Sequence, residues 1–303
     1  MTHVRIGVTL PQFTSDADAF VGAARRAEAL GLDSVWVFDH LWPLGGPRQH
    51  PVLECWTALA WLAASTSRIG IGTLVTRSSL RNPALLASMA ATVARVAPGR
   101  VTVGLGSGDD KSRDENEAFG IPYLAGEARL RQLRSTLEVL TQARAGRQVD
   151  VSDDTVTVRG LPAASPADLR LWVGGWGPRV VRLAAERADG WNAWGGGAAR
   201  FEAAVLALRA AARGRAVEAT WGGTLVLGTD ENDARAKLGR RDPTAYVVGG
   251  PEQVTAELRT LAAAGAGHLI VSFHDARDPS ALELLASEVV PRVRQPDMYP
   301  PGV

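Results

Sequence analysis

The sequence predicts an α/β protein built as one (β/α)8 barrel, the TIM barrel, with loop insertions. Three observations support this class. Short apolar runs alternate with helical stretches about eight times over 303 residues, which is the length of such a barrel with added loops. Runs such as Ile69–Val75 and Val101–Leu105 are apolar on both faces, as parallel strands covered on both sides are. No low-complexity linker divides the chain, so we expect one domain over residues 1–303.

The clearest βαβ unit lies between Arg68 and Asp110. A helix that begins at Asn82-Pro83 and ends before Pro98-Gly99 separates two apolar runs there. Asn at the N-cap and Pro at the first helical position are typical of a helix start. The strands expected along the whole chain are Val4–Leu10, Ser34–Phe38, Ile69–Val75, Val101–Leu105, Leu169–Val173, Trp191–Trp194, Ala219–Leu227 and His268–Phe273.

Helices are expected between these strands, and several end at a glycine that favours a C-terminal stop. Asp110–Gly126 has mixed charge and is predicted to be a long loop. Gln148–Arg159 alternates around an Asp-Asp turn, which predicts an exposed hairpin. The expected helices besides the one after Pro83 are Asp16–Leu30, Glu54–Ser65, Glu127–Ala145, Arg179–Arg187, Phe201–Arg213, Asp230–Leu238, Pro251–Ala264 and Ser280–Arg294.

A doubly wound open sheet is the competing architecture. Such a sheet usually carries G-x-G-x-x-G after its first strand, and Pro11-Gln12-Phe13 stands there instead. The barrel is therefore the favoured prediction.

Composition excludes several functional classes. The formal net charge of +1 gives no electrostatic footprint for nucleic acid or a membrane surface. No apolar run approaches the ~20 residues of a membrane span, and the N-terminus lacks the pattern of a signal peptide. Cys55 is the only cysteine. We therefore expect a cytoplasmic enzyme that acts on a small molecule.

Absent motifs narrow the chemistry further. Only five histidines occur and none forms His-x-His, so no metal site is predicted. Neither Lys111 nor Lys237 lies in an apolar strand, which argues against Schiff-base catalysis. No G-x-S-x-G nucleophile elbow is present.

Barrel enzymes carry their working residues at the carboxyl ends of the strands. Glycines there let backbone N–H groups approach an anion, and tryptophans can wall an aromatic ring. This mixture favours a flat, heteroaromatic ligand that bears a phosphate. The residues expected at this end are Gln12, Phe13, Asp39, His40, Trp42, Thr73–Arg77, Ser107–Asp110, Gly174–Gly177, Trp194–Gly197, His274 and Asp275.

Several of these features have a purely structural alternative. Asp39-His40 is either a functional pair or a capped turn, and Gly104, Gly106 and Gly108 are either functional or a tight turn. The segments Gly174–Gly177 and Gly195–Gly197 together resemble a phosphate cradle.

Three other residues have mainly a structural interpretation. Trp172 and Trp191 are expected in the core, because they lie within strands. His268 is expected at the start of a strand, away from the active face.

In combination these motifs resemble the luciferase-like monooxygenase superfamily, and in particular its members that use a deazaflavin, coenzyme F-420. The likeness covers most of the chain and is thinnest from Gln148 to Ala167 and in the last third. The matching stretches are IGVTLPQF from Ile6, AEALGLDSVWVFDHLW at Ala27–Trp42, WTALAWLAASTSRIGIGTLV at Trp56–Val75, RNPALLASMAATVARVAPGRVTVGLGSGD at Arg81–Asp109, ENEAFG at Glu115–Gly120, and LWVGGWGPRVVRLAAERADGWNAW at Leu171–Trp194.

The resemblance implies a cofactor ring across the barrel mouth, backed by a bulge in the third strand. That bulge often holds a non-prolyl cis peptide, which aligns with Leu74-Val75. It also implies that His40 and Asp109 flank the reactive carbon, although some relatives have the longer Glu at the second position. Trp42 is similar to an active-site aromatic of the group.

The cofactor phosphate is implied to lie over Gly175–Gly177 and Gly195–Gly197. The complete implied cofactor-binding set is Asp39, His40, Thr73, Leu74, Val75, Ser107, Gly108, Asp109, Gly174, Gly175, Trp176, Gly177, Trp194, Gly195, Gly196 and Gly197.

The resemblance implies hydride transfer between the deazaflavin and a small organic substrate, with His40 as base or acid and Asp109 as proton donor or electrostatic partner. One alternative is an FMN-dependent two-component monooxygenase that uses O2 and reduced flavin from a separate reductase. Another alternative is a flavin-binding protein without catalysis.

Substrate and assembly are less well defined by the sequence. The substrate depends on the variable loops Leu41–Pro51, Asp110–Tyr123 and Gly239–Val248. The resemblance also implies a homodimer through the early helices, where Trp56 and Trp61 either contribute or pack against the barrel.

Overall fold

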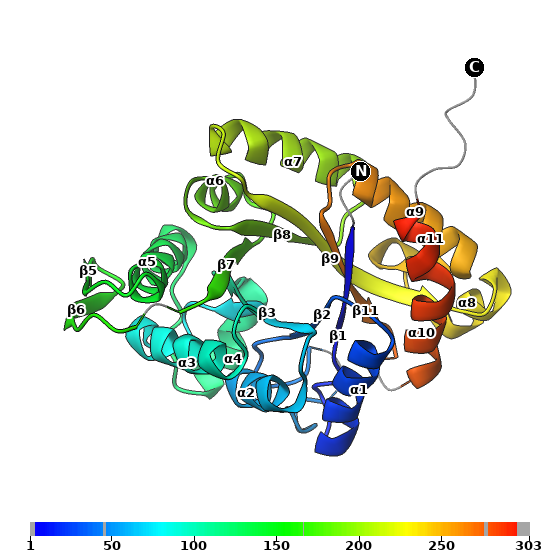
Figure 1. The fold of residues 1–303 in the computed structure, drawn as a ribbon, viewed down its shortest axis with the longest axis horizontal. Helices are drawn as coiled ribbons and strands as arrows, with labels where there is room; N and C mark the ends of the chain where they lie inside the picture. Colours follow the sequence, from blue (N-terminus) through cyan, green and yellow to red (C-terminus); the bar gives the residue numbers. More distant parts are fainter. Residues whose placement is uncertain (1–3, 45–46, 166, 276–277, 296–303) are drawn as a thin grey trace.

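Eight parallel strands close into a barrel, as predicted, so the alternative of a doubly wound open sheet is wrong (Figure 1). The computed structural model describes residues 4–44, 47–165, 167–275 and 278–295. Pairing between β8 and β9 closes the ring. The barrel strands, in their order around the ring, are β1 (Arg5–Thr9), β2 (Ser34–Val37), β3 (Gly70–Arg77), β4 (Val101–Gly106), β7 (Leu169–Gly174), β8 (Gly190–Trp194), β9 (Glu218–Leu227) and β11 (His268–Phe273).

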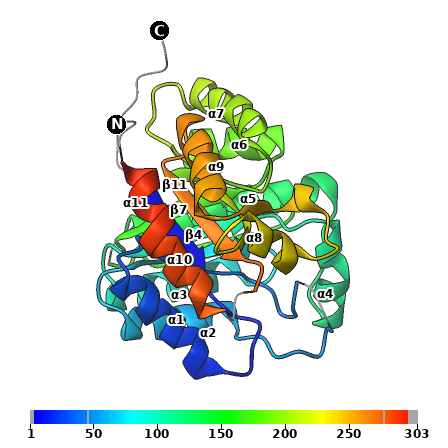
Figure 2. The same ribbon diagram turned by 90° about the vertical axis from the view of Figure 1, so that its right-hand side faces the viewer.

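Helices surround the barrel (Figures 1 and 2). The start signals in the sequence are used as predicted: the Asn82 side chain accepts from the backbone N–H of Ala84, and Pro83 is the first helical residue. The described α-helices are α1 (Ala17–Ala29), α2 (Cys55–Ser65), α3 (Pro83–Val96), α4 (Arg113–Ala118), α5 (Gly126–Arg144), α6 (Pro178–Arg187), α7 (Ala198–Ala212), α8 (Glu231–Leu238), α9 (Pro251–Ala263), α10 (Pro279–Leu284) and α11 (Val290–Arg294).

The prediction of a continuous loop over Asp110–Gly126 was wrong. A 3-10 turn over Asp110–Ser112 leads into α4, which lies at the right-hand edge of Figure 2. The Asp109 carboxylate accepts from the Ser112 backbone N–H and so caps the turn. Acidic residues in the first turn of α4 also favour a helix there through the helix dipole.

Two other elements differ from the expectation. The predicted loop before Gly249 contains the short strand β10 (Val247–Gly249). This strand pairs with the C-terminal end of β9, past the residues of β9 that pair with β8. The single helix expected over Ser280–Arg294 is interrupted by a π-helical turn at Leu285–Val289, between α10 and α11. The predicted hairpin is present as antiparallel β5 (Val149–Ser152) and β6 (Thr157–Leu161).

Aromatic rings fill the interior of the barrel. Trp36 and Trp172 stack with ring centroids 4.9 Å apart, and they pack with Ile270 and Leu74. Both expected core tryptophans, Trp172 and Trp191, are confirmed as buried. Because this stack fills the barrel axis, only the two ends remain open for ligands.

The two tryptophans of α2 have different environments. Trp56 is almost fully buried and donates from Nε1 to the Thr76 hydroxyl at 3.0 Å, so it packs against the barrel. Trp61 is 36% exposed and touches the Phe20 ring. No helix within the described ranges is sufficiently long and apolar to cross a lipid bilayer.

Candidate active site

The third strand is bulged where the resemblance implies it. The pairing register of β3 with β4 shifts between Thr73 and Thr76, and the peptide bond between Leu74 and Val75 is cis. Buried Thr73 joins the two strands, because its hydroxyl donates to the carbonyl of Gly104 and accepts from the Gly104 N–H, each at 3.0 Å. Thr73 therefore holds the bulge from beneath.

Glycines of β4 and β7 make room for the side chain of Val75. A Cβ at Gly106 would lie 2.4 Å from Val75 Cγ2, and one at Gly174 would lie 2.8 Å from Val75 Cγ1. A Cβ at Gly104 would lie 2.4 Å from the Thr73 carbonyl oxygen. Gly104 and Gly106 belong to β4, so the alternative of a tight turn is wrong for both. Of Gly104, Gly106 and Gly108, the last alone has a positive φ, of 69°.

His40 follows β2 and is oriented by an acid that the sequence did not single out. Its Nδ1 lies 3.0 Å from Oε2 of Glu115 in α4, and the Glu115 side chain is 1% exposed. The other carboxylate oxygen accepts from the backbone N–H groups of Leu41 and Trp42. Since Nδ1 faces the carboxylate, Nε2 is the ring nitrogen left for a reacting partner.

Arg77, at the end of β3, balances the buried acid. Its Nη2 lies 2.9 Å from Oε2 of Glu115, at ion-pair distance but without hydrogen-bond geometry. Its Nη1 donates to Oδ1 of Asn116 at 3.0 Å. Burial raises the pKa of Glu115, but hydrogen bonds from His40 and Leu41 and the charges of His40 and Arg77 outweigh it and leave that pKa lowered. The Glu115 carboxylate is therefore ionised beside His40.

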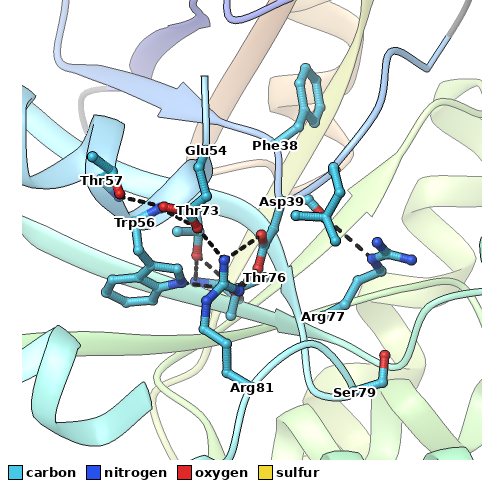
Figure 3. Close-up of polar contacts among 12 residues, drawn as sticks. Phe38, Asp39, Glu54, Trp56, Thr57, Thr73, Thr76, Arg77, Ser79 and Arg81 are labelled. Carbon is cyan, nitrogen blue, oxygen red and sulfur yellow. Dashed lines mark hydrogen bonds and ion pairs between the residues drawn. The ribbon is translucent and has the colours of Figure 1, made fainter. Parts of the chain in front are cut away.

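Asp39 lies in a second, buried ion-pair network (Figure 3). Arg81 donates to both of its carboxylate oxygens, at 2.5 and 3.0 Å, and the Thr76 hydroxyl donates to one of them. Arg81 also pairs with Glu54, the N-cap residue of α2. The network therefore ties the end of β2 to β3 and α2, directly before His40 in the chain.

The two glycine segments expected to form a phosphate cradle lie together. Trp176 donates from Nε1 to the carbonyl oxygen of Trp194 at 2.8 Å, and a Cβ at Gly196 would lie 2.8 Å from the Trp176 ring. Gly177 and Gly197 are the N-cap residues of α6 and α7, and neither helix start is capped by a side chain. A Cβ at Gly195 or Gly197 would meet open space. Backbone N–H groups at the start of α7 are thus accessible to an anion, whereas the first residue of α6, Pro178, has no N–H to offer.

Aromatic rings connect this cradle to the His40 side of the mouth. The Phe38 ring meets Trp194 edge to face with centroids 5.5 Å apart, and it stacks on Phe13 at 6.2 Å. Phe38 precedes His40 by two residues, and Trp194 immediately precedes the glycine segment Gly195–Gly197. His40 and the cradle therefore lie at the same end of the barrel, as expected.

The remaining predicted residues lie at this end with partners of their own. Asp109 is exposed, and its carboxylate accepts from the Ser112 hydroxyl at 3.1 Å. Its negative charge also stabilises the positive charge of Arg77. The Ser107 hydroxyl donates to the carbonyl of Gly108. Trp42 is half-buried beneath the Arg48 guanidinium, 4.2 Å from its ring centroid. The described residues contain no cluster of three or more His, Cys, Asp or Glu side chains that could hold a metal ion.

Sequence reasoning missed most of the polar residues that support the site, which are Glu54, Arg81, Glu115 and Asn116, and it placed Arg77 at this end without a role. Glu115 was visible only as the first letter of ENEAFG, inside a segment predicted to be a loop. A carboxylate in a mixed-charge segment is usually solvated, and nothing local indicates that it will be buried against a histidine 75 residues away.

A family model described as luciferase-like monooxygenase matches residues 1–246. The chain belongs to this family. This luciferase-like protein is 31% identical over 322 aligned positions to the F-420-dependent glucose-6-phosphate dehydrogenase of Beutenbergia cavernae, and the alignment covers 88% of this chain and 91% of that protein.

Solved structures confirm the luciferase-like fold. An F-420-dependent secondary alcohol dehydrogenase, in complex with an F-420–acetone adduct, superposes with a TM-score of 0.83 at 21% identity, covering 97% of this chain and 100% of that chain. The oxygenating constituent of 3,6-diketocamphane monooxygenase from Pseudomonas putida, in complex with FMN, superposes with a TM-score of 0.76 at 19% identity, with the same coverage. At these identities both neighbours show the shared fold alone.

Proposed function

We propose that this luciferase-like protein is an oxidoreductase that transfers a hydride between coenzyme F-420 and a small organic substrate. The observation that carries the proposal is the His40–Glu115 pair at a mouth whose opposite rim is a glycine cradle. The 31% identity to an F-420-dependent dehydrogenase, over most of both chains, supports the choice of cofactor. Substrates of the relatives, glucose 6-phosphate and secondary alcohols, define the first panel to test.

The residues at the mouth fit a ring that bears a ribityl phosphate. The start of α7, with its glycine N-cap, offers N–H donors, and open space at Gly195 and Gly197 lets an anion approach them. The half-exposed Val75 side chain, fixed by the bulge, would support one face of the ring. Trp194 and Phe38 would form an aromatic wall beside it.

The bound deazaflavin would supply a carbon that accepts or donates a hydride. His40, held through Nδ1 by Glu115, would take or give the substrate proton at Nε2. Asp109 keeps its proposed role as proton donor or electrostatic partner, and its capping bond to Ser112 would position it. For Asp39 we propose positioning of His40, because its carboxylate is buried and occupied by Arg81 and Thr76.

Titration of purified protein with coenzyme F-420, followed by quenching of cofactor fluorescence, tests the cofactor. A His40→Ala variant should bind it with the wild-type dissociation constant and lose turnover by roughly 10²-fold or more. Full activity of His40→Ala would refute its role. Failure of the wild-type protein to bind F-420 would refute the proposal, and failure to bind FMN as well would also refute the FMN alternative.

The FMN-dependent monooxygenase remains the second candidate, because an FMN-bound monooxygenase shares the fold. It would need reduced flavin from a separate reductase and would consume O2. An oxygenated product that forms from a substrate with chemically reduced FMN and O2, and does not form with F-420, would favour it. Stoichiometric cofactor binding without turnover on the whole panel would instead favour a non-catalytic flavin-binding protein.

We also propose a homodimer that packs through α2 and its neighbours. Trp61 supports this proposal, because a tryptophan 36% exposed on a surface helix is typical of an interface. Trp56 does not contribute, since it is buried against the barrel. Sedimentation of wild-type protein and a Trp61→Glu variant would test the assembly: a dimer in the first and a monomer in the second are expected.

A further inference from the structure

The end of the barrel opposite the mouth contains a cavity of about 250 Å3 that the proposed function does not use. Residues at the beginnings of the strands line it. Four of them are arginines and only one is a carboxylate: Arg5, Arg68, Arg100, Arg170 and Asp33. The Trp36–Trp172 stack lies between this cavity and the mouth.

The positive charge around this cavity is only partly neutralised. Arg5 and Arg170 share one carboxylate, that of Glu218. Asp33 accepts from Arg294 at 2.6 Å. An arginine that forms no ion pair within the protein can form a charge-assisted ion pair with a ligand instead.

The other two arginines, Arg68 and Arg100, form no ion pair with a described carboxylate, although the charge of Glu28 acts on both of them. Arg100 donates to the backbone carbonyls of Ala63, Thr66 and Ile69, which leave its charge in place. The exposed Arg68 side chain makes no hydrogen bond or ion pair with any residue that the structure describes.

His268, the first residue of β11, adds a buried donor. Its Nε2 lies 2.8 Å from the Ser34 hydroxyl, which already accepts from Trp36 Nε1 at 2.7 Å. The Ser34 hydroxyl can then use its own hydrogen by donating to Nε2, which places the ring proton on Nδ1. Nδ1 has no partner among the described residues, and His268 is 1% exposed. An unpaired N–H donor thus lies in a residue that lines the cavity.

A second unpartnered donor lies beside it. Trp172 Nε1 is buried and has no hydrogen-bond partner within the described part of the chain. The Trp172 ring meets the His268 ring edge to face, with centroids 5.7 Å apart. Buried donors of this kind are normally satisfied by protein, water or a ligand.

We propose that this cavity binds a small tetrahedral oxyanion, a phosphate or sulfate group, between the arginines and the His268 ring. The unsatisfied ring nitrogen of His268, which lines the cavity, and that of Trp172 behind it are donors, and a multivalent oxyanion accepts hydrogen bonds better than water does. Burial, together with the charges of Arg5 and Arg170, lowers the pKa of His268 well below its usual value, so the neutral ring tolerates these arginines. The cavity has room for several water-sized molecules and therefore for one phosphate group.

Calorimetric titration of wild-type protein with inorganic phosphate, at an ionic strength held constant with chloride, tests the site. Saturable binding is expected, together with a shift of the His268 ring nitrogens in the NMR spectrum of 15N-histidine-labelled protein. The His268 signals are identified by their loss in a His268→Asn variant. A parallel titration with glycerol 3-phosphate shows whether the anion must be free or can belong to a phosphorylated metabolite.

Arg68→Gln should raise the dissociation constant for phosphate about tenfold, since it removes one charged donor and breaks no ion pair. Arg95→Gln is the matched control, an exposed arginine in the last turn of α3 that does not line the cavity, and it should bind like the wild type. Absence of saturable binding, equal binding by wild type and Arg68→Gln, or a phosphate shift at His40 with none at His268 would overturn the proposal.

Discussion

Nδ1 of His40 lies 3.0 Å from a carboxylate oxygen of Glu115, and α4 buries that carboxylate almost completely. The contact joins the loop after β2 to a short helix 75 residues later in the chain. It fixes which ring nitrogen of His40 faces the protein and leaves the other for substrate. The chemistry of the mouth therefore depends on a helix of six residues.

Glu115→Gln should lower kcat roughly 10²-fold while cofactor affinity stays within about twofold, because the amide cannot stabilise a protonated His40. Steady-state kinetics together with cofactor titration measure both quantities. Glu117→Gln, an exposed acid in the same helix, is the matched control and should behave like the wild type. Equal loss in both variants would mean that the helix, and not the carboxylate, is responsible.

Asp39→Ala should destabilise the protein by about 3–5 kcal/mol, since it leaves the Arg81 guanidinium buried and half-paired. Glu54→Gln should cost only about 1 kcal/mol, because the Glu54 side chain is 38% exposed and water can replace the carboxylate. Urea unfolding of the three proteins provides the comparison. Similar losses in the two variants would contradict the burial argument.

Gly106→Ala should cost about 1–3 kcal/mol of stability, because its new methyl group would meet Val75 Cγ2. Val75→Ala should restore much of that loss, since it removes the atom in the way. Gly104→Ala provides the contrast: its methyl group would meet the Thr73 carbonyl oxygen, which no side-chain substitution removes. A double-mutant cycle on thermal or urea unfolding measures both couplings. A Cβ at Gly104 would also lie 3.0 Å from Val75 Cγ1, so a small rescue is expected there; a rescue of Gly104→Ala as large as that of Gly106→Ala would contradict this packing.

Acidification should destabilise the fold through His268. Its pKa is lowered in the folded protein, so below about pH 6.5 His268 binds a proton in the unfolded chain but stays neutral in the folded chain. The free energy of unfolding should therefore fall between pH 7 and pH 5, by up to about 1.4 kcal/mol per pH unit from this residue. His268→Gln should flatten that slope. An unchanged slope in the variant would show that other groups cause the loss of stability at acidic pH.

The architecture was readable from the sequence because its signals are local. Apolar runs such as Val101–Leu105 and the Asn82-Pro83 helix start depend on neighbouring residues only, and each lies within a residue or two of its predicted bounds. The family motifs also led to the Leu74-Val75 cis peptide and to the glycine segment Gly195–Gly197.

The supporting ion pairs were not readable, because each joins segments that are distant in the chain. Glu115 and Arg81 appear in the sequence as ordinary surface charges, and only the closed barrel brings them to His40 and Asp39. Gly106 was ambiguous for the same reason. Its role depends on the side chain of Val75 in the neighbouring strand, and sequence spacing does not reveal that contact.

The stacked pair Trp36 and Trp172 divides the barrel at mid-height into two compartments. A core packed in this way blocks passage along the barrel axis, so a molecule that arrives at the His40 side is expected to leave by the opening through which it came. Where a cofactor already covers the inner part of that vestibule, the second reactant can approach only from the outside. The cofactor would then bind first and leave last, and the second reactant would bind after it and leave before it. Dead-end inhibition patterns should reveal this obligatory order of binding.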